Sequence, residues 1–76
     1  VIIAEAPLSV GSKGAEVVKL QIALQYLGFF PNTLDATGYY GGITRKAVAD
    51  FQTARSMIAT GLADLATIKA LNALML

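Results

Sequence analysis

The sequence predicts an all-α fold, a compact three-helix bundle with glycine-rich turns. Three stretches carry apolar residues at helical spacing, and glycine-containing segments separate them. Apolar residues make up 55% of the 76-residue chain and charged residues only 14%, which is enough apolar material for one core. We expect helices at about Ala15–Leu27, Gly42–Ser56 and Leu65–Leu74, with no central sheet.

The first helix has well-marked ends. Its apolar stripe is formed by Val17, Leu20, Leu24 and Leu27. Gly28 follows the stripe directly and suits a left-handed C-cap, which would let the next residue fold back onto the helix. The residues before it contain Pro7, which disfavours a helix, so we expect residues 1–7 to be a tail or linker and residues 8–76 to be the domain.

The second helix is expected to follow a sharp glycine turn. Glycine permits backbone angles that a Cβ forbids, and Gly38, Gly41 and Gly42 precede the apolar stripe. In the loop before that turn, Phe29 and Phe30 are adjacent, and we expect at least one of them to lie in the core. The expected core residues are Val17, Leu20, Leu24, Val48, Phe51, Ile68 and Leu71.

The second half of the chain contains an internal repeat. Thr37-Gly38 and Thr60-Gly61 stand 23 residues apart, from position 37 to position 60, and each pair precedes a helix. The same offset aligns Gly41 with Asp64. Both residue types are acceptable N-caps, and aspartate is the stronger of the two. We therefore expect Gly38 and Gly61 to share one backbone conformation.

Composition excludes several function classes. A net charge of +1 argues against a polyanionic partner, and the absence of cysteine and histidine removes the usual metal ligands. A helix-turn-helix reading of the last two helices fails because Lys69 is the one cation on the would-be recognition helix. Asp35 and Asp50 could be imagined as a catalytic pair, but so small a chain builds little cleft. We expect no enzyme activity, metal, cofactor, nucleic acid or membrane partner.

Three motifs in order resemble one known family. The first motif is Leu8-x-x-Gly11-x-x-Gly14-x-x-Val17-x-x-Leu20-Gln21-x-x-Leu24-x-x-x-Gly28. The second motif is Thr37-Gly38-Tyr39-Tyr40-Gly41-x-x-Thr44-x-x-Ala47-Val48-x-x-Phe51-Gln52. The third motif is Gly61-Leu62-x-x-x-x-Thr67-x-x-x-Leu71. Together they resemble the peptidoglycan-binding-like domains. The resemblance implies a three-helix, non-catalytic module that binds peptidoglycan, outside the cell or in its envelope, and anchors a covalently attached hydrolase or similar enzyme. The alternative is a structural or protein-docking domain of the same fold that binds no glycan.

The chain departs from the family pattern at three positions. Thr37 stands where the family often has aspartate, Asp64 where it often has glycine, and Gly42 where it often has proline. These exchanges preserve turn and cap chemistry, so the expected fold is unaffected. The threonine weakens any role for an acid at position 37 in ligand contact.

The expected binding surface lies around the second loop and the start of the second helix. Peptidoglycan offers sugar faces, amides and carboxylates, and the side chains suited to them are Phe30, Asn32, Asp35, Thr37, Tyr39 and Arg45. The N-terminus of the second helix adds unpaired N–H groups suited to a carboxylate of the stem peptide. Gln21, Gln52 and Thr44 are instead expected to brace the local structure.

Overall fold

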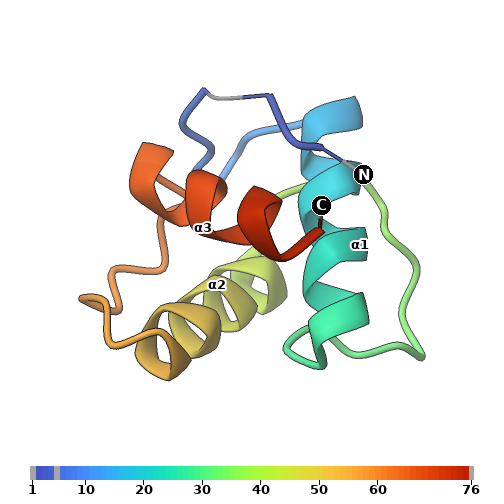
Figure 1. Cartoon of the computed structure of the whole chain (residues 1–76). Coiled ribbons are helices and arrows are strands. Elements are labelled where there is room, and N and C mark those ends of the chain that lie inside the picture. Colours follow the sequence, from blue (N-terminus) through green and yellow to red (C-terminus); the bar gives the residue numbers. More distant parts are fainter. Residues whose placement is uncertain (1, 5, 76) are drawn as a thin grey trace.

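Three helices form the molecule, and they confirm the predicted all-α class. The structure is a computed structural model that describes residues 2–4 and 6–75. It contains α1 (Ala15–Leu27), α2 (Gly42–Ala54) and α3 (Leu65–Met75). In the view of Figure 1, α3 lies above α2, and both lie to one side of α1. Within the described residues there is no strand; two isolated bridges pair Leu8 with Ala63 and Lys13 with Tyr39.

Left-handed residues end the first two helices. Gly28 has φ 89°, its N–H donates to the carbonyl of Gln25, and the N–H of Phe29 donates to the carbonyl of Leu24 at 2.8 Å. This is the predicted C-cap. α2 ends two residues earlier than expected because Ser56 adopts φ 59°, which stops the helix and sends the Met57 N–H back to the carbonyl of Gln52. α3 extends one residue further than expected, to Met75.

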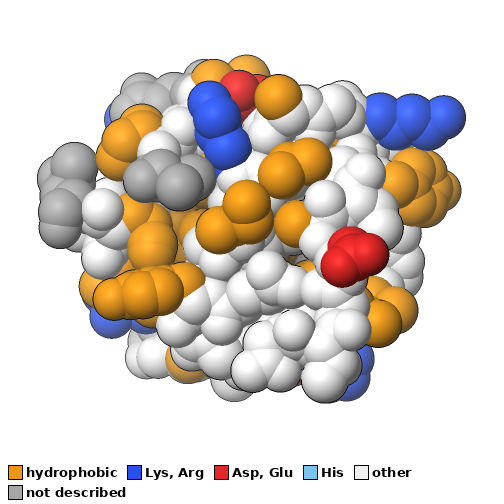
Figure 2. Space-filling model, turned by 90° about the vertical axis from the view of Figure 1, so that its right-hand side faces the viewer, with side chains coloured by type: hydrophobic (Ala, Val, Ile, Leu, Met, Phe, Trp, Pro, Cys, Tyr) orange, Lys and Arg blue, Asp and Glu red, His pale blue; other side chains and the backbone are white. Residues whose placement is uncertain are grey.

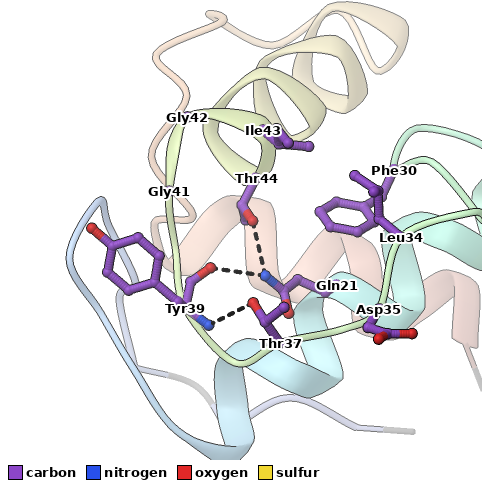
Figure 3. Close-up of a pocket in the computed structure, with 10 residues that line it drawn as sticks. All are labelled: Gln21, Phe30, Leu34, Asp35, Thr37, Tyr39, Gly41, Gly42, Ile43 and Thr44. Atoms are coloured by element: carbon purple, nitrogen blue, oxygen red, sulfur yellow. Dashed lines mark hydrogen bonds between the residues drawn. The ribbon is translucent and has the colours of Figure 1, made fainter.

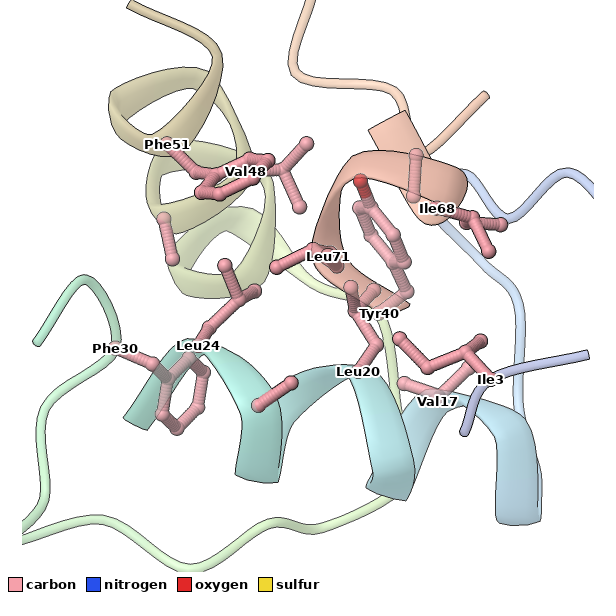
Figure 4. Close-up of a cluster of buried hydrophobic side chains, with 13 residues drawn as sticks. Ile3, Val17, Leu20, Leu24, Phe30, Tyr40, Val48, Phe51, Ile68 and Leu71 are labelled. Atoms are coloured by element: carbon pink, nitrogen blue, oxygen red, sulfur yellow. The ribbon is translucent and has the colours of Figure 1, made fainter. Parts of the chain in front are cut away.

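All three helices contribute to one core, as Figure 4 shows. The seven residues expected to be buried are all buried, together with Ile3, Phe30 and Tyr40 among others. Phe29 packs edge-on against Phe51, with ring centroids 5.7 Å apart. Close packing of this kind is the main source of stability in so small a domain.

The N-terminal segment is docked on the helices at Ile3. That side chain is fully buried, and the Asn72 side-chain amide holds its backbone on both sides: the Ile3 N–H donates to Oδ1 and Nδ2 donates to the Ile3 carbonyl, each at 2.8 Å. Glu16 accepts the N–H of Ala4, and this bond, together with Lys19, holds the pKa of the Glu16 carboxyl below its usual value. The segment expected to be a tail therefore contributes a core residue.

Tyr40 ties the first glycine turn to the second. Its ring is fully buried, and its hydroxyl donates to the carbonyl of Gly61 at 2.6 Å. Burial raises the pKa of Tyr40 to about 12. The hydroxyl therefore lies inside the core. Among the described residues, no helix has the length and apolar character needed to cross a membrane.

Candidate functional site

A cavity of about 330 Å³ opens where the loop after α1 meets the beginning of α2 (Figure 3). One wall comes from that loop and carries apolar side chains, and the other comes from the first turn of α2. The residues that line the cavity are Gln21, Phe30, Leu34, Asp35, Thr37, Tyr39, Gly41, Gly42, Ile43 and Thr44. Leu34 and Ile43 are partly open to solvent, whereas Phe30 is buried to 5% exposure.

Gln21 anchors the turn that forms the base of the cavity. Its Oε1 accepts the N–H of Gly38 at 2.9 Å, while its Nε2 donates to the carbonyl of Tyr39 and to Oγ1 of Thr44. The side chain is 1% exposed and all of its polar atoms are bonded. The predicted bracing role of Gln21 is confirmed. Thr44 also has a structural role, because its Oγ1 accepts a hydrogen bond from the Gln21 side chain.

The beginning of α2 has no side-chain cap. Gly41 occupies the N-cap position, and within the described part of the chain no side chain accepts a hydrogen bond from the first turn of this helix. The carbonyl of Gly41 accepts the N–H of Arg45, the first bond of the helix. Among the described residues, no side chain caps the N–H groups of residues 42–44, which lie at the positive end of the helix dipole, and all three residues line the cavity.

The second glycine turn is built like the first. Gln52 Oε1 accepts the N–H of Gly61 at 2.9 Å, and its Nε2 donates to the carbonyl of Leu62 and to Oγ1 of Thr67. The predicted shared conformation is confirmed in φ, which is 83° at Gly38 and 77° at Gly61. One difference stands out: Asp64 caps α3, and its Oδ1 accepts the N–H of Thr67 at 2.9 Å.

Four of the six predicted site residues line the cavity. Asp35 and Thr37 are exposed there, and Phe30 forms part of its apolar wall. Because Phe30 is buried, its ring presents no open face to a sugar. Tyr39 also lines the cavity, but its ring lies on the other side of the segment from Gln21 (Figure 3), with the ammonium group of Lys13 5.9 Å from the ring centroid.

The other two predicted residues lie elsewhere. Asn32 lines a neighbouring hollow of about 330 Å³ together with Gly28, Phe29 and Pro31. Arg45 is one turn further along α2, where its side-chain stem covers Gly61: a Cβ at Gly61 would stand 2.7 Å from Arg45 Cγ. The structure thus places Arg45 against the second turn and not among the residues that line the cavity.

Leu34 and Ile43 are cavity residues that sequence reasoning missed. Ile43 is a large apolar residue at the start of a helix, yet its side chain is 54% exposed. Its position outside the apolar stripe of that helix was the sequence signal that could have indicated this exposure. Leu34 lies in an irregular loop, which has no periodicity to indicate its direction. Its carbonyl accepts a hydrogen bond from Nε2 of Gln25, which fixes the loop against α1.

Charged groups are sparse and separated on the face that contains α1 and the following loop. Figure 2 shows apolar side chains scattered there among uncharged polar side chains and backbone. The residues lining the cavity include one ionisable carboxyl group, Asp35, and no lysine or arginine. Any anion bound in the cavity would therefore depend on backbone N–H groups and hydroxyls.

Comparison with known proteins identifies the family. Residues 13–71 match the family described as "Putative peptidoglycan binding domain". No curated protein matches the chain. Among solved structures, the N-terminal domain of SleB is 29% identical, with a TM-score of 0.84, and the match covers 91% of this chain and 92% of that one.

Two further structures are similar over nine-tenths of this chain. The Burkholderia AP3 phage endolysin is 37% identical with a TM-score of 0.80, and the match covers 90% of this chain and 25% of that one. A peptidoglycan-binding protein from Clostridioides difficile, solved in complex with glutamine hydroxamate, is 30% identical with a TM-score of 0.82, covering 92% and 42%. The chain thus spans a quarter of the endolysin and less than half of the clostridial protein. By fold, motifs and matched length, this chain belongs to the family of putative peptidoglycan-binding domains.

Proposed function

We propose that this chain is a non-catalytic, carbohydrate-binding module for peptidoglycan that works in the cell envelope or outside the cell. Its binding site is the cavity between the loop after α1 and the first turn of α2. The observation that carries this proposal is the combination of family membership with one cavity whose walls are apolar and whose helix end is uncapped. A site of this kind offers contact area together with open hydrogen-bond donors.

The module would anchor an enzyme to its substrate. A similar domain makes up a quarter of a phage endolysin, so we propose that a catalytic domain is covalently attached in the parent protein. Anchoring raises the local concentration of the enzyme at the wall without new chemistry in the module. The cavity is lined by a single carboxyl group, which supports a binding role and not the paired carboxylates of glycoside hydrolysis.

A sedimentation assay tests the proposal. The domain is mixed with insoluble peptidoglycan sacculi, and chitin and cellulose serve as controls for non-specific adsorption. We expect weak, saturable co-sedimentation with sacculi alone, because a small open cavity buries little ligand. Equal binding to all three polymers, or none to sacculi, would contradict the proposal and favour a structural or protein-docking domain.

Matched variants test whether peptidoglycan binds at the cavity. Ile43→Ser and Leu34→Ser remove apolar wall at partly exposed positions and should weaken sacculus binding about tenfold, as expected for the loss of about 1–2 kcal/mol of contact. The control is Ile58→Ser, which changes an 86% exposed isoleucine in the α2–α3 loop. Circular dichroism checks that all three remain folded. Tyr39→Ala and Arg45→Ala test a ring and a cation of the predicted binding surface; in the structure the ring lies near Lys13 and the cation's side-chain stem against Gly61.

A further inference from the structure

The second glycine turn indicates what the cavity beside the first turn binds. Both turns are held by a glutamine. In both, the N-cap carbonyl accepts the first helical bond: Gly41 accepts from the Arg45 N–H and Asp64 from the Ile68 N–H. The two structures diverge at the side chain of the N-cap residue. Asp64 places a carboxylate oxygen 2.9 Å from the N–H of Thr67, whereas Gly41 leaves the corresponding N–H, that of Thr44, without a side-chain partner.

The polar groups that remain in the cavity select for a hydrogen-bond acceptor. Both Nε2 hydrogens of Gln21 are donated, to Tyr39 and Thr44, and the side chain is 1% exposed. Its amide therefore has no hydrogen left to donate to a ligand. What remains at the helix end are N–H groups and hydroxyl hydrogens, which are donors. Asp35, exposed on the opposite wall, is an acceptor that suits the peptide N–H groups of a bound chain.

The apolar walls select for small aliphatic groups. Phe30, Leu34 and Ile43 line the cavity with hydrocarbon, and a volume of about 330 Å³ suits one or two short side chains. Sugar rings are usually bound against an open aromatic face. Phe30 is buried and the Tyr39 ring lies outside the cavity, so the site has no such platform.

We propose that the cavity binds the carboxylate-bearing, aliphatic end of a stem peptide, with the carboxylate at the N–H of Thr44, the group that corresponds to the Thr67 N–H that Asp64 caps in α3. This inference rests on the proposed function and names the part of peptidoglycan that the site reads. In α3, the carboxylate of Asp64 takes the place that the ligand carboxylate would take at the beginning of α2. Placing an aspartate at Gly41 should therefore fill the site from within.

The first test is a pair of probes that differ only in charge. Amide chemical shifts of the labelled domain are followed during titration with N-acetyl-D-Ala-D-Ala, ending either in the free acid or in the amide. We expect the acid to shift the N–H signals of residues 42–44 and to bind about tenfold more tightly than the amide, because charge-assisted hydrogen bonds are the stronger ones. Equal affinity of acid and amide, or shifts confined to other residues, would overturn the inference.

The second test uses Gly41→Asp with Gly41→Ala as its matched control. Gly41 has φ −105°, which any residue adopts, and an added Cβ would meet only the Tyr39 ring, at 3.1 Å. Both variants carry that Cβ, but only the aspartate caps the helix. We expect Gly41→Asp to raise the melting temperature and abolish acid binding, and Gly41→Ala to retain it. Acid binding by Gly41→Asp at the parent's affinity would overturn the inference.

Sacculus sedimentation separates the two levels of the proposal. If the parent domain sediments with sacculi but shows no preference for the acid, peptidoglycan binding stands and the stem-peptide assignment is wrong. If the parent does not sediment with sacculi, the proposed function itself fails. The probe titration needs no variant, so the inference stays testable even if Gly41→Asp does not fold.

Discussion

The two glycine turns of this domain share an anchor and differ in what surrounds it. Gln21 and Gln52 make matching bonds to the glycine N–H, the next carbonyl and a helix threonine. The first glutamine stands 17 residues before its glycine and the second only nine, a difference of eight. The longer connection supplies Phe30, Leu34 and Asp35 to the cavity.

The surroundings explain why the first turn is the candidate site. At the second turn, Asp64 caps the helix and the Arg45 stem covers the glycine. At the first turn the N-cap is a glycine, and the longer loop stands apart from the helix end to leave a cavity. Under the proposed function, one structural unit serves stability or binding according to two local features, the N-cap residue and the loop length.

Removal of the two glutamines should give the largest effects. Gln52→Ala should cost about 3 kcal/mol and Gln21→Ala about 2 kcal/mol, because each leaves a buried glycine N–H and a carbonyl without a partner. We expect the smaller loss at Gln21 because water from the cavity can reach its orphaned groups. The measurement is the free energy of unfolding in urea. Gln25→Ala is the control, since its amide donates to exposed carbonyls; a Gln21 loss above the Gln52 loss would contradict the comparison.

Alanine substitutions of Gly38 and Gly61 should lower the free energy of unfolding by different amounts, because the surroundings of the two glycines differ. Both have positive φ, which costs a side chain about 1–2 kcal/mol. Gly61→Ala should cost more than Gly38→Ala, because its Cβ would stand 2.7 Å from Arg45 Cγ, against 3.0 Å from Val18 Cγ2 at Gly38. Repeating both in an Arg45→Ala background should shrink the Gly61 loss alone. If the background change leaves the Gly61 loss the same, Arg45 does not crowd this turn.

The pH dependence of stability tests the bond by which Tyr40 links the two turns. Because its folded pKa is raised to about 12 from an ordinary 10, the unfolded chain loses this proton first. Stability should therefore be intact below pH 10 and fall as the pH rises from 10 to 12. Tyr40→Phe should lose about 1 kcal/mol at neutral pH, from the missing bond to the Gly61 carbonyl, and should flatten the alkaline decline. A Tyr40→Phe variant with the same alkaline decline as the parent would show that another group causes it.

The helix caps should give the smallest effect. Asp64→Ala removes the bond to the Thr67 N–H and should cost about 1 kcal/mol. Thr67, through its side chain and its N–H, lowers the pKa of Asp64, so this contribution is present at neutral pH and lost as the pH falls through the lowered value. Urea unfolding at neutral and at acid pH measures it. A loss at neutral pH that persists undiminished after the carboxyl is protonated would mean that the cap is not its source.

Local rules predicted the scaffold from sequence. Helical periodicity and the positions of glycine indicated the three helices, the left-handed cap at Gly28 and the matching φ at Gly38 and Gly61. Ser56 ended α2 early because a non-glycine residue adopted positive φ, which sequence signals rarely reveal.

The cavity was harder to predict because it depends on the path of an irregular loop. Four of the residues predicted from sequence line the cavity, but Leu34 and Ile43 were not predicted, and the Arg45 side chain lies against the second turn. The direction of each of these side chains follows from packing between segments that are far apart in sequence. Ile3, similarly, is buried in a core formed by distant segments, and Asn72 binds its backbone from the other end of the chain.

The most direct test compares the beginnings of the two helices during titration with soluble peptidoglycan fragments. The backbone amide signals of residues 42–44 and of residues 65–67 are followed in the same experiment, on the same folded protein. The open N-terminus of α2 predicts saturable shifts at residues 42–44 and unchanged signals at 65–67, where Asp64 already occupies the site. Shifts at the beginning of α3 with none at α2 would contradict the assignment of the binding site to the first turn.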